Sequence, residues 1–244
     1  VKIFSTTTGE LIHSLDTSAK KVFFHPTQKE LVVESNQEVQ IWNLDSGELV
    51  RTINLGTDLF HALSPDGEEF LTLSVEDHLK IWNLRTEEPV QTINGLNRIC
   101  TAYFHPKRTE EIIVVTHLGF IKIWNKNTSQ WITDVETNFP FFFFKARLSF
   151  SPDGEQIAYL TDNPEEQKFI IWNLRTGQEV QTIRLDGYVR STSFSPDGEQ
   201  IITTRKEGQK KTIEIFKIET GKRVQEFDNN SLDNSILGRP RIIH

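Results

Sequence analysis

One thirteen-residue motif recurs along the chain and constrains the fold more than any other feature. The segment IWNLRTGQEVQTI, residues 171–183, matches IWNLRTEEPVQTI, residues 81–93, at ten of thirteen positions without a gap. Four further copies start at Ile3, Ile41, Ile123 and Ile215, and successive copies start 38 to 48 residues apart. A period of this length indicates an architecture of repeated supersecondary units.

A second motif lies between these copies. It reads FSPDGEQI at Phe150 and Phe194, LSPDGEEF at Leu63, and begins FHP at Phe24 and Phe104. In Ser-Pro-Asp-Gly, proline presets the second turn position, aspartate favours the third, and glycine takes the left-handed residue that follows. His25 and His105 replace the serine, and we expect these side chains to cap the turn. Apolar β-forming residues flank the turn, so the motif predicts a β-hairpin.

The thirteen-residue motif predicts another hairpin. Aromatic and β-branched residues precede its Asn-Leu-Arg-Thr-Gly turn, and EVQTI at residues 179–183 alternates apolar with polar residues after the turn. A period of two marks a half-buried strand. Each repeat therefore contains four short strands, a to d, joined in a meander. No helical periodicity interrupts this pattern, so we predict an all-β chain.

These motifs resemble those of the WD-repeat β-propeller family. The repeat length, the SPDG hairpin and the tryptophan closing the third strand (KIWN at residues 80–83, IIWN at residues 170–173) all match that family. The resemblance covers nearly the whole chain. It implies four-stranded blades packed side by side and a non-catalytic scaffold that binds proteins.

The chain also departs from the pattern of that family. The usual Trp-Asp dipeptide is Trp-Asn here, as at Trp42 and Trp82, and the Gly-His dipeptide expected after the fourth strand is absent. In the family, that histidine joins an Asp–His–Ser–Trp hydrogen-bond network within a blade. Without it we expect no such network, and blades that rest mainly on apolar packing.

We predict five complete blades with partial blades at both termini. The chain begins inside a strand c, the last complete set ends near Phe227, and RPRIIH at residues 239–244 aligns with the start of a strand a. In one interpretation, the two ends share a composite blade of a six-bladed ring. That blade would lack strand b and leave unpaired strand edges, which proteins normally avoid. In the other, the chain is part of a longer, seven-bladed propeller with two incomplete end blades. In both, residues 1–244 form a single WD-repeat propeller domain, incomplete at both ends in the second.

Composition narrows the expected setting. The net charge of −7 disfavours a nucleic-acid partner, because such partners select basic surfaces. Cys100 is the single cysteine, which excludes an intrachain disulfide; we expect a buried, inert thiol and a cytoplasmic protein. The longest apolar run, FPFFFF at residues 139–144, is too short to span a bilayer, so we expect no membrane association.

Motifs that carry chemistry are missing from the sequence. It contains no Gly-x-Ser-x-Gly, no His-Glu-x-x-His, no phosphate-binding loop and no His or Cys pair with zinc-ligand spacing. We therefore expect no enzymatic activity, no cofactor and no metal.

The variable segments point to one loop face as the place where partner proteins bind. TNFPFFFFK at residues 137–145 lengthens a d–a connection, and TDNPEEQK at residues 161–168 and the basic RKEGQKK at residues 205–211 lengthen b–c connections. Four consecutive phenylalanines on an alternating strand cannot all face inward. They either anchor a partner or plug the propeller rim, and Trp131 is either an exposed contact or rim packing. The predicted partner-binding residues are Phe141, Phe142, Phe143, Phe144, Trp131, Glu165, Glu166, Lys210 and Lys211.

Three functions fit these observations. The first is a protein-interaction scaffold that presents this face to one or more proteins. The second is the gating or substrate-recognition propeller of a larger enzyme, since SPDG hairpins also occur in prolyl-oligopeptidase propellers. The third is a periplasmic propeller of the Tol-associated type. A fold by itself does not choose among them.

Overall fold

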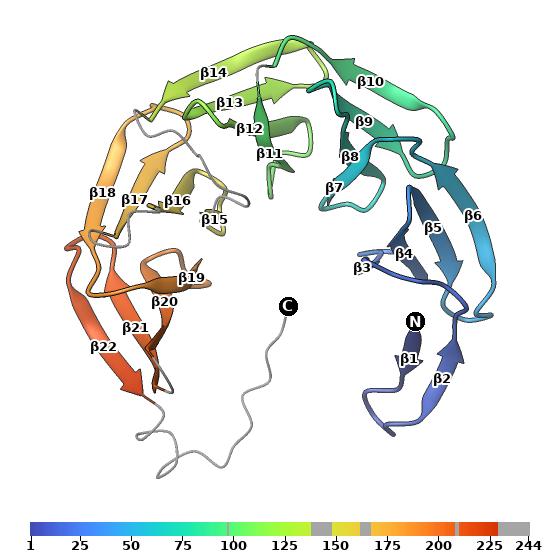
Figure 1. The fold of residues 1–244 in the computed structure, drawn as a ribbon, viewed down its shortest axis with the longest axis horizontal. Helices are drawn as coiled ribbons and strands as arrows, with labels where there is room; N and C mark the ends of the chain where they lie inside the picture. Colours follow the sequence, from blue (N-terminus) through green and yellow to red (C-terminus); the bar gives the residue numbers. More distant parts are fainter. Residues whose placement is uncertain (97, 138–147, 162–166, 208–209, 229–244) are drawn as a thin grey trace. The chain divides into compact units, whose positions relative to one another are not determined.

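The computed structural model describes residues 1–96, 98–137, 148–161, 167–207 and 210–228 (Figure 1). The chain divides into two compact units, Val1–Pro140 and Phe141–His244. No helix occurs in these ranges, and hence none that could cross a membrane.

Fourteen strands lie in the described part of the first unit. They are β1 (Lys2–Phe4), β2 (Leu11–Ser14), β3 (Lys21–Phe24), β4 (Glu30–Ser35), β5 (Glu38–Asn43), β6 (Leu49–Asn54), β7 (Leu59–Leu63), β8 (Glu69–Leu73), β9 (Leu79–Asn83), β10 (Pro89–Ile93), β11 (Ile99–Phe104), β12 (Glu111–Thr116), β13 (Phe120–Asn125) and β14 (Gln130–Glu136). They form a two-stranded first sheet, β1-β2, and four-stranded second, third and fourth sheets, β3–β6, β7–β10 and β11–β14.

Eight described strands make up the second unit. They are β15 (Leu148–Phe150), β16 (Gln156–Leu160), β17 (Lys168–Asn173), β18 (Glu179–Arg184), β19 (Val189–Phe194), β20 (Gln200–Glu207), β21 (Lys210–Lys217) and β22 (Arg223–Asp228). They form the fifth sheet, β15–β18, and the sixth sheet, β19–β22. In all six sheets each strand pairs antiparallel with its neighbour in sequence, as Figure 1 shows, so the predicted all-β meander is confirmed. The predicted strand at residues 239–244 lies outside the described residues.

The Ser-Pro-Asp-Gly turn forms as its chemistry predicts. In the sixth sheet, Gly198 has φ of 76° and donates its N–H to the carbonyl of Ser195 at 2.9 Å. The Ser195 hydroxyl accepts the N–H of Gln200 at 2.9 Å and donates to the Asp197 carboxylate. That hydrogen bond from Ser195 holds the pKa of Asp197 below its ordinary value. The side chains of the turn therefore stabilise the a–b hairpin before any tertiary packing is counted.

A histidine caps the a–b turn in the second and fourth sheets. Nδ1 of His25 accepts the backbone N–H groups of Thr27 and Gln28 at 3.3 and 3.1 Å. Nδ1 of His105 accepts those of the residues two and three positions later at 3.1 and 3.0 Å. The prediction that these histidines cap turns is confirmed.

The asparagine of Trp-Asn caps the c–d turn. Oδ1 of Asn43 accepts the N–H groups of Asp45 and Ser46 at 2.8 and 2.9 Å, and Gly47 follows with φ of 72°. Because the cap needs only a side-chain oxygen, asparagine can fill this position as well as the aspartate of Trp-Asp.

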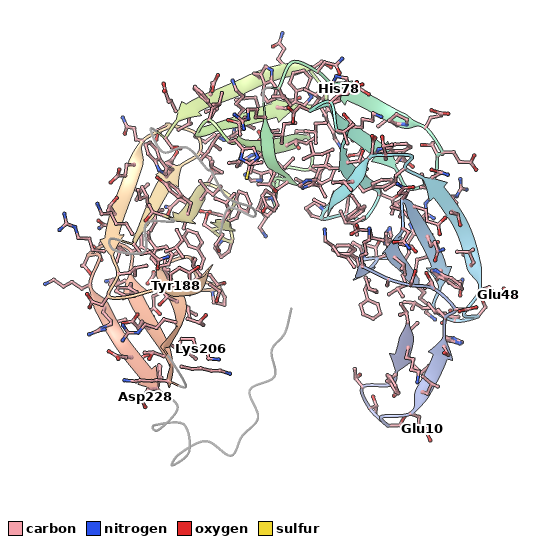
Figure 2. The ribbon with its side chains drawn as sticks, viewed as in Figure 1. Glu10, Glu48, His78, Tyr188, Lys206 and Asp228 are labelled. Carbon is pink, nitrogen blue, oxygen red and sulfur yellow. The ribbon has the colours of Figure 1, made fainter. Side chains whose placement is uncertain are left out.

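Successive sheets within a unit pack face to face. The face that carries Trp82 covers Val32, Ile41 and Ile53 of the second sheet. Rings of Phe23, Phe60, Phe70 and Trp82 follow one another across that interface, with centroids 5.4, 5.6 and 5.7 Å apart. Figure 2 shows side chains filling the space between neighbouring sheets of each unit.

A side chain at one position of strand d also links each sheet to the next within a unit. It forms a hydrogen bond with the c–d turn of the following sheet. The pairs are His13 Nε2 with Leu44 O (3.0 Å), Arg51 Nη1 with Arg85 O (2.7 Å), Gln91 Nε2 with Ser129 Oγ (2.8 Å) and Gln181 Nε2 with Ile218 O (3.2 Å).

The expectation that no Trp-centred polar network forms is wrong for the third sheet. Trp82 Nε1 donates to Thr72 Oγ1 at 2.8 Å, and Thr72 Oγ1 donates to Asp58 Oδ2 at 3.3 Å. Lys80 Nζ lies 2.8 Å from the same carboxylate oxygen. Asp58 precedes strand β7 and reaches the threonine directly, so no histidine is needed between them.

Two further expectations need correction. Residues 205–211 are mostly strand rather than loop, because Lys206, labelled in Figure 2, pairs with Lys211, and Glu207 pairs with Lys210, in a longer β20–β21 ladder. Cys100 lies on β11, the predicted strand a, but it is half-buried rather than buried.

Candidate functional site

A groove lies between the third and fourth sheets, within the first unit. It encloses about 240 Å³. Its walls come from the β10–β11 connection, the end of β12, the β12–β13 turn and strands β13 and β14. The lining residues are Gly95, Leu96, Thr116, Leu118, Phe120, Lys122, Trp131 and Asp134. The groove therefore opens among the d–a and b–c connections, the face on which the sequence predicts partner binding.

Strand alternation places the polar and aromatic side chains of β13 on the groove side. Ile121 and Ile123 point to the opposite face and have no exposed surface, so Phe120 and Lys122 between them face the groove. Asp134 of β14 pairs in register with Lys122.

Trp131 reaches the groove because of a β-bulge. The register shifts between Ile123 and Trp124, which sets Trp131 opposite Trp124 on the groove side. The two indole rings meet edge to face, with centroids 4.9 Å apart and planes at 65°. Trp124 also packs against the buried cluster between the two sheets, so it anchors Trp131, which remains 38% exposed.

A cation lies over the aromatic wall of the groove. Lys122 Nζ is 5.4 Å from the centroid of the Phe120 ring and 5.8 Å from that of Trp131, within cation–π range. The same ammonium group forms an ion pair with Asp134 Oδ2. The side chain of Lys122 is 25% exposed and that of Asp134 is 50% exposed, so the pair lies at the solvent boundary.

Alignment of the repeats shows that two apolar residues of this groove, Leu118 and Phe120, are peculiar to the fourth sheet among the complete sheets. At the position of Leu118 the other complete sheets carry Asn36, Glu76, Glu166 and Lys210. At the position of Phe120 they carry Glu38, His78, Lys168 and Thr212. Every one of these is polar, whereas Leu118 is apolar and 51% exposed. Leu118 and Phe120 therefore place apolar side chains at two positions where the other complete repeats carry polar ones.

A second groove lies between the same two sheets, near the c–d turns. It encloses about 270 Å³. The ion pair between Lys126 and Glu69 and the hydrogen bond from Gln91 to Ser129 cross it. These contacts join the two sheets, which gives this second groove a structural role.

The groove around Trp131 combines an aromatic and apolar wall with a few polar groups. Its polar groups are the Lys122–Asp134 pair and the hydroxyl of Thr116. Among the residues that the structure describes, no group of three or more His, Cys, Asp or Glu side chains could hold a metal ion.

The predicted partner-binding residues fall in three places. Trp131 lies in the groove. Lys210 and Lys211 belong to the second unit, both exposed at the start of β21. Phe141, Phe142, Phe143, Phe144, Glu165 and Glu166 lie outside the described residues, so their role stays a prediction.

Sequence reasoning missed Leu118, Phe120, Lys122 and Asp134. The signal that could have found them was the column-by-column alignment of the repeats, which marks Leu118 and Phe120 as apolar exceptions. Lys122 and Asp134 carry no such signal, because charged residues are ordinary at exposed strand positions.

Comparison with known proteins gives a likeness in fold. No protein-family model matches the chain, and no curated protein matches it. Among solved structures it is similar to hydrazine synthase from Kuenenia stuttgartiensis, with a TM-score of 0.62 over 86% of this chain and 67% of that chain. The two sequences are 15% identical, so the likeness shows the fold alone. With the repeated four-stranded sheets, it is consistent with a propeller-like β fold.

Proposed function

We propose that this chain is a non-catalytic protein-interaction scaffold that binds a partner protein through the groove around Trp131. The observation that carries the proposal is the apolar surface of Leu118 and Phe120 at positions where the other complete sheets are polar. Trp131 adds a large, rigid ring at the rim, and tryptophan is enriched among residues that dominate binding energy.

We also propose that the sheets are blades of a WD-repeat propeller, either a six-bladed ring with a composite blade or part of a seven-bladed propeller. The repeated motifs, the asparagine caps of the c–d turns and the Asp58–Thr72–Trp82 network support this proposal. A rigid stack of such sheets would hold the groove in one shape, which lowers the entropy cost of binding.

The experiment identifies the proteins that co-purify with the tagged chain from a lysate of the organism that produces it, and compares the unaltered chain with its variants. We expect Trp131→Ala and Leu118→Ser each to reduce the recovered partner at least tenfold, because loss of a side chain that dominates binding costs about 2 kcal/mol. Val50→Ser is the matched control, because Val50 is 53% exposed on β6 and lies outside the groove.

Thermal unfolding of each variant shows whether the fold is intact. If both groove variants fold and recover the same proteins as Val50→Ser, the groove is not the partner site and the proposal fails.

A further inference from the structure

Lys122 occupies the groove in the way that a bound cation would. Its ammonium group lies over two aromatic rings, at 5.4 and 5.8 Å from their centroids, and pairs with the Asp134 carboxylate. Aromatic faces beside a carboxylate are the surroundings in which proteins bind organic cations. The contacts that Lys122 now makes, with two aromatic rings and a carboxylate, are therefore the contacts that a bound organic cation would make in this groove.

Charge around the groove favours a second, incoming cation. The side chain of Asp134 is 50% exposed, and its hydrogen bond with Lys122 is made through Oδ2. Glu136 lies two residues further along the same face of β14 and is exposed. Two carboxylates thus face one lysine, on a chain whose net charge is −7.

Building on the proposed function, we propose that the groove binds an arginine side chain of the partner protein, which displaces Lys122 from Trp131 and Asp134. A guanidinium is planar, so it stacks flat on an indole face and pairs with both oxygens of one carboxylate through two parallel N–H groups, whereas an ammonium is a compact point charge. Leu96 and Leu118 supply apolar contact for the arginine methylenes and for a neighbouring apolar residue. Lys122 then turns toward Glu136.

The test is a titration of the purified chain with a capped pentapeptide that has a central arginine between alanines. Binding is measured by the change in tryptophan fluorescence. The control peptide carries citrulline, the neutral isostere of arginine. We expect citrulline to bind about tenfold more weakly, because it loses the cation–π and ion-pair contributions. Added salt should weaken binding of the arginine peptide and leave binding of the citrulline peptide unchanged.

Variants of Lys122 decide between displacement and direct contact. Lys122→Met keeps the aliphatic packing and removes the competing cation, so it should tighten arginine binding about tenfold, while Asp134→Asn weakens it by a similar factor. Weaker or unchanged arginine binding by Lys122→Met overturns the inference, and so does equal binding of the two peptides. Binding of an acidic peptide that is lost in Lys122→Met would identify the opposite kind of partner and would also overturn it.

The two proposals fail in different ways. If Trp131→Ala recovers the natural partner unchanged, the proposed function is wrong. If recovery depends on Trp131 but the purified chain does not distinguish arginine from citrulline, the scaffold function stands and the arginine inference is wrong.

Discussion

Thr72→Val tests the buried network of the third sheet. Thr72 has no exposed surface, and its hydroxyl connects Trp82 Nε1 at 2.8 Å with Asp58 Oδ2 at 3.3 Å. Valine has nearly the shape of threonine, so the substitution removes the hydroxyl without opening a cavity. It leaves the indole N–H, on a side chain that is 5% exposed, without its acceptor.

The expected cost is about 2 kcal/mol of unfolding free energy. A buried donor that loses its partner costs about 1–3 kcal/mol. Asp58 keeps Lys80 at 2.8 Å, so its carboxylate stays paired and adds little to the loss. In a double-mutant cycle with Trp82→Phe, the two changes should be coupled by about 1 kcal/mol, because once the indole is gone the hydroxyl has no donor to satisfy.

The sixth sheet provides a matched control. Thr203 occupies the equivalent repeat position and has no exposed surface, but Phe216 replaces the tryptophan. The Thr203 hydroxyl has no hydrogen-bond partner among the described residues. Thr203→Val should therefore be neutral or should stabilise the chain by up to about 1 kcal/mol.

Urea unfolding followed by circular dichroism gives the two changes in stability. If the hydrogen bonds of Thr72 stabilise the fold, Thr72→Val should lower the free energy of unfolding by about 2 kcal/mol more than Thr203→Val does. If the two variants unfold at the same urea concentration with equal slopes, the Thr72 hydroxyl contributes no more than an unsatisfied one, and the reasoning is refuted.

Two further predictions concern close packing and pH. A Cβ on Gly67, at φ of 80°, would lie 2.5 Å from Pro26 Cδ, so Gly67→Ala should cost about 3 kcal/mol in urea unfolding. Gly198→Ala, at φ of 76° but with 3.5 Å to the proline of the preceding turn, should cost only about 1 kcal/mol; equal costs would contradict the packing argument. Burial, reinforced by the charge of Lys21, lowers the pKa of His61 to about 4. The unfolded chain binds that proton near pH 6.5 and the folded chain near pH 4, so His61 should withdraw up to about 3 kcal/mol of stability as the pH falls between these values. His61→Gln should remove that part of the pH dependence in urea titrations at pH 7, 5.5 and 4, and an unchanged profile would show that His61 titrates normally.

The features that the sequence predicts are those whose causes are local. Asn43 and Ser195 cap their turns through atoms two to five residues away, so the motif already contains both partners. The same holds for His25, whose role follows from its place in the turn. Hairpins, strand order and the all-β class follow from these caps and from the alternation of apolar residues between them.

The features that the sequence does not predict are contacts between residues that lie far apart along the chain. Asp58 and Thr72 are 14 residues apart, and the aspartate contacts the threonine directly, without the histidine that links such residues in the WD-repeat motif. The site of Trp131 depends on a β-bulge that turns its ring toward Lys122. The same bulge recurs at this motif position in all six sheets, but it becomes visible only once the strand register is known. The place of residues 205–211 between strands b and c predicts a loop, whereas strand pairing continues through Lys206–Lys211 and Glu207–Lys210 and satisfies the backbone there.

The fourth sheet separates the side chains that hold the fold from those that form the groove. Ile121 and Ile123 have no exposed surface and carry the packing on one face, while Phe120 and Lys122 alternate with them on the other. Leu118 lies in the turn before β13 and is half exposed, so a serine there removes little buried apolar area. Residues of the groove can therefore change with little effect on the stability of the sheet. A repeat protein can in this way acquire a binding site in a single repeat while its remaining repeats keep only the side chains that stacking requires.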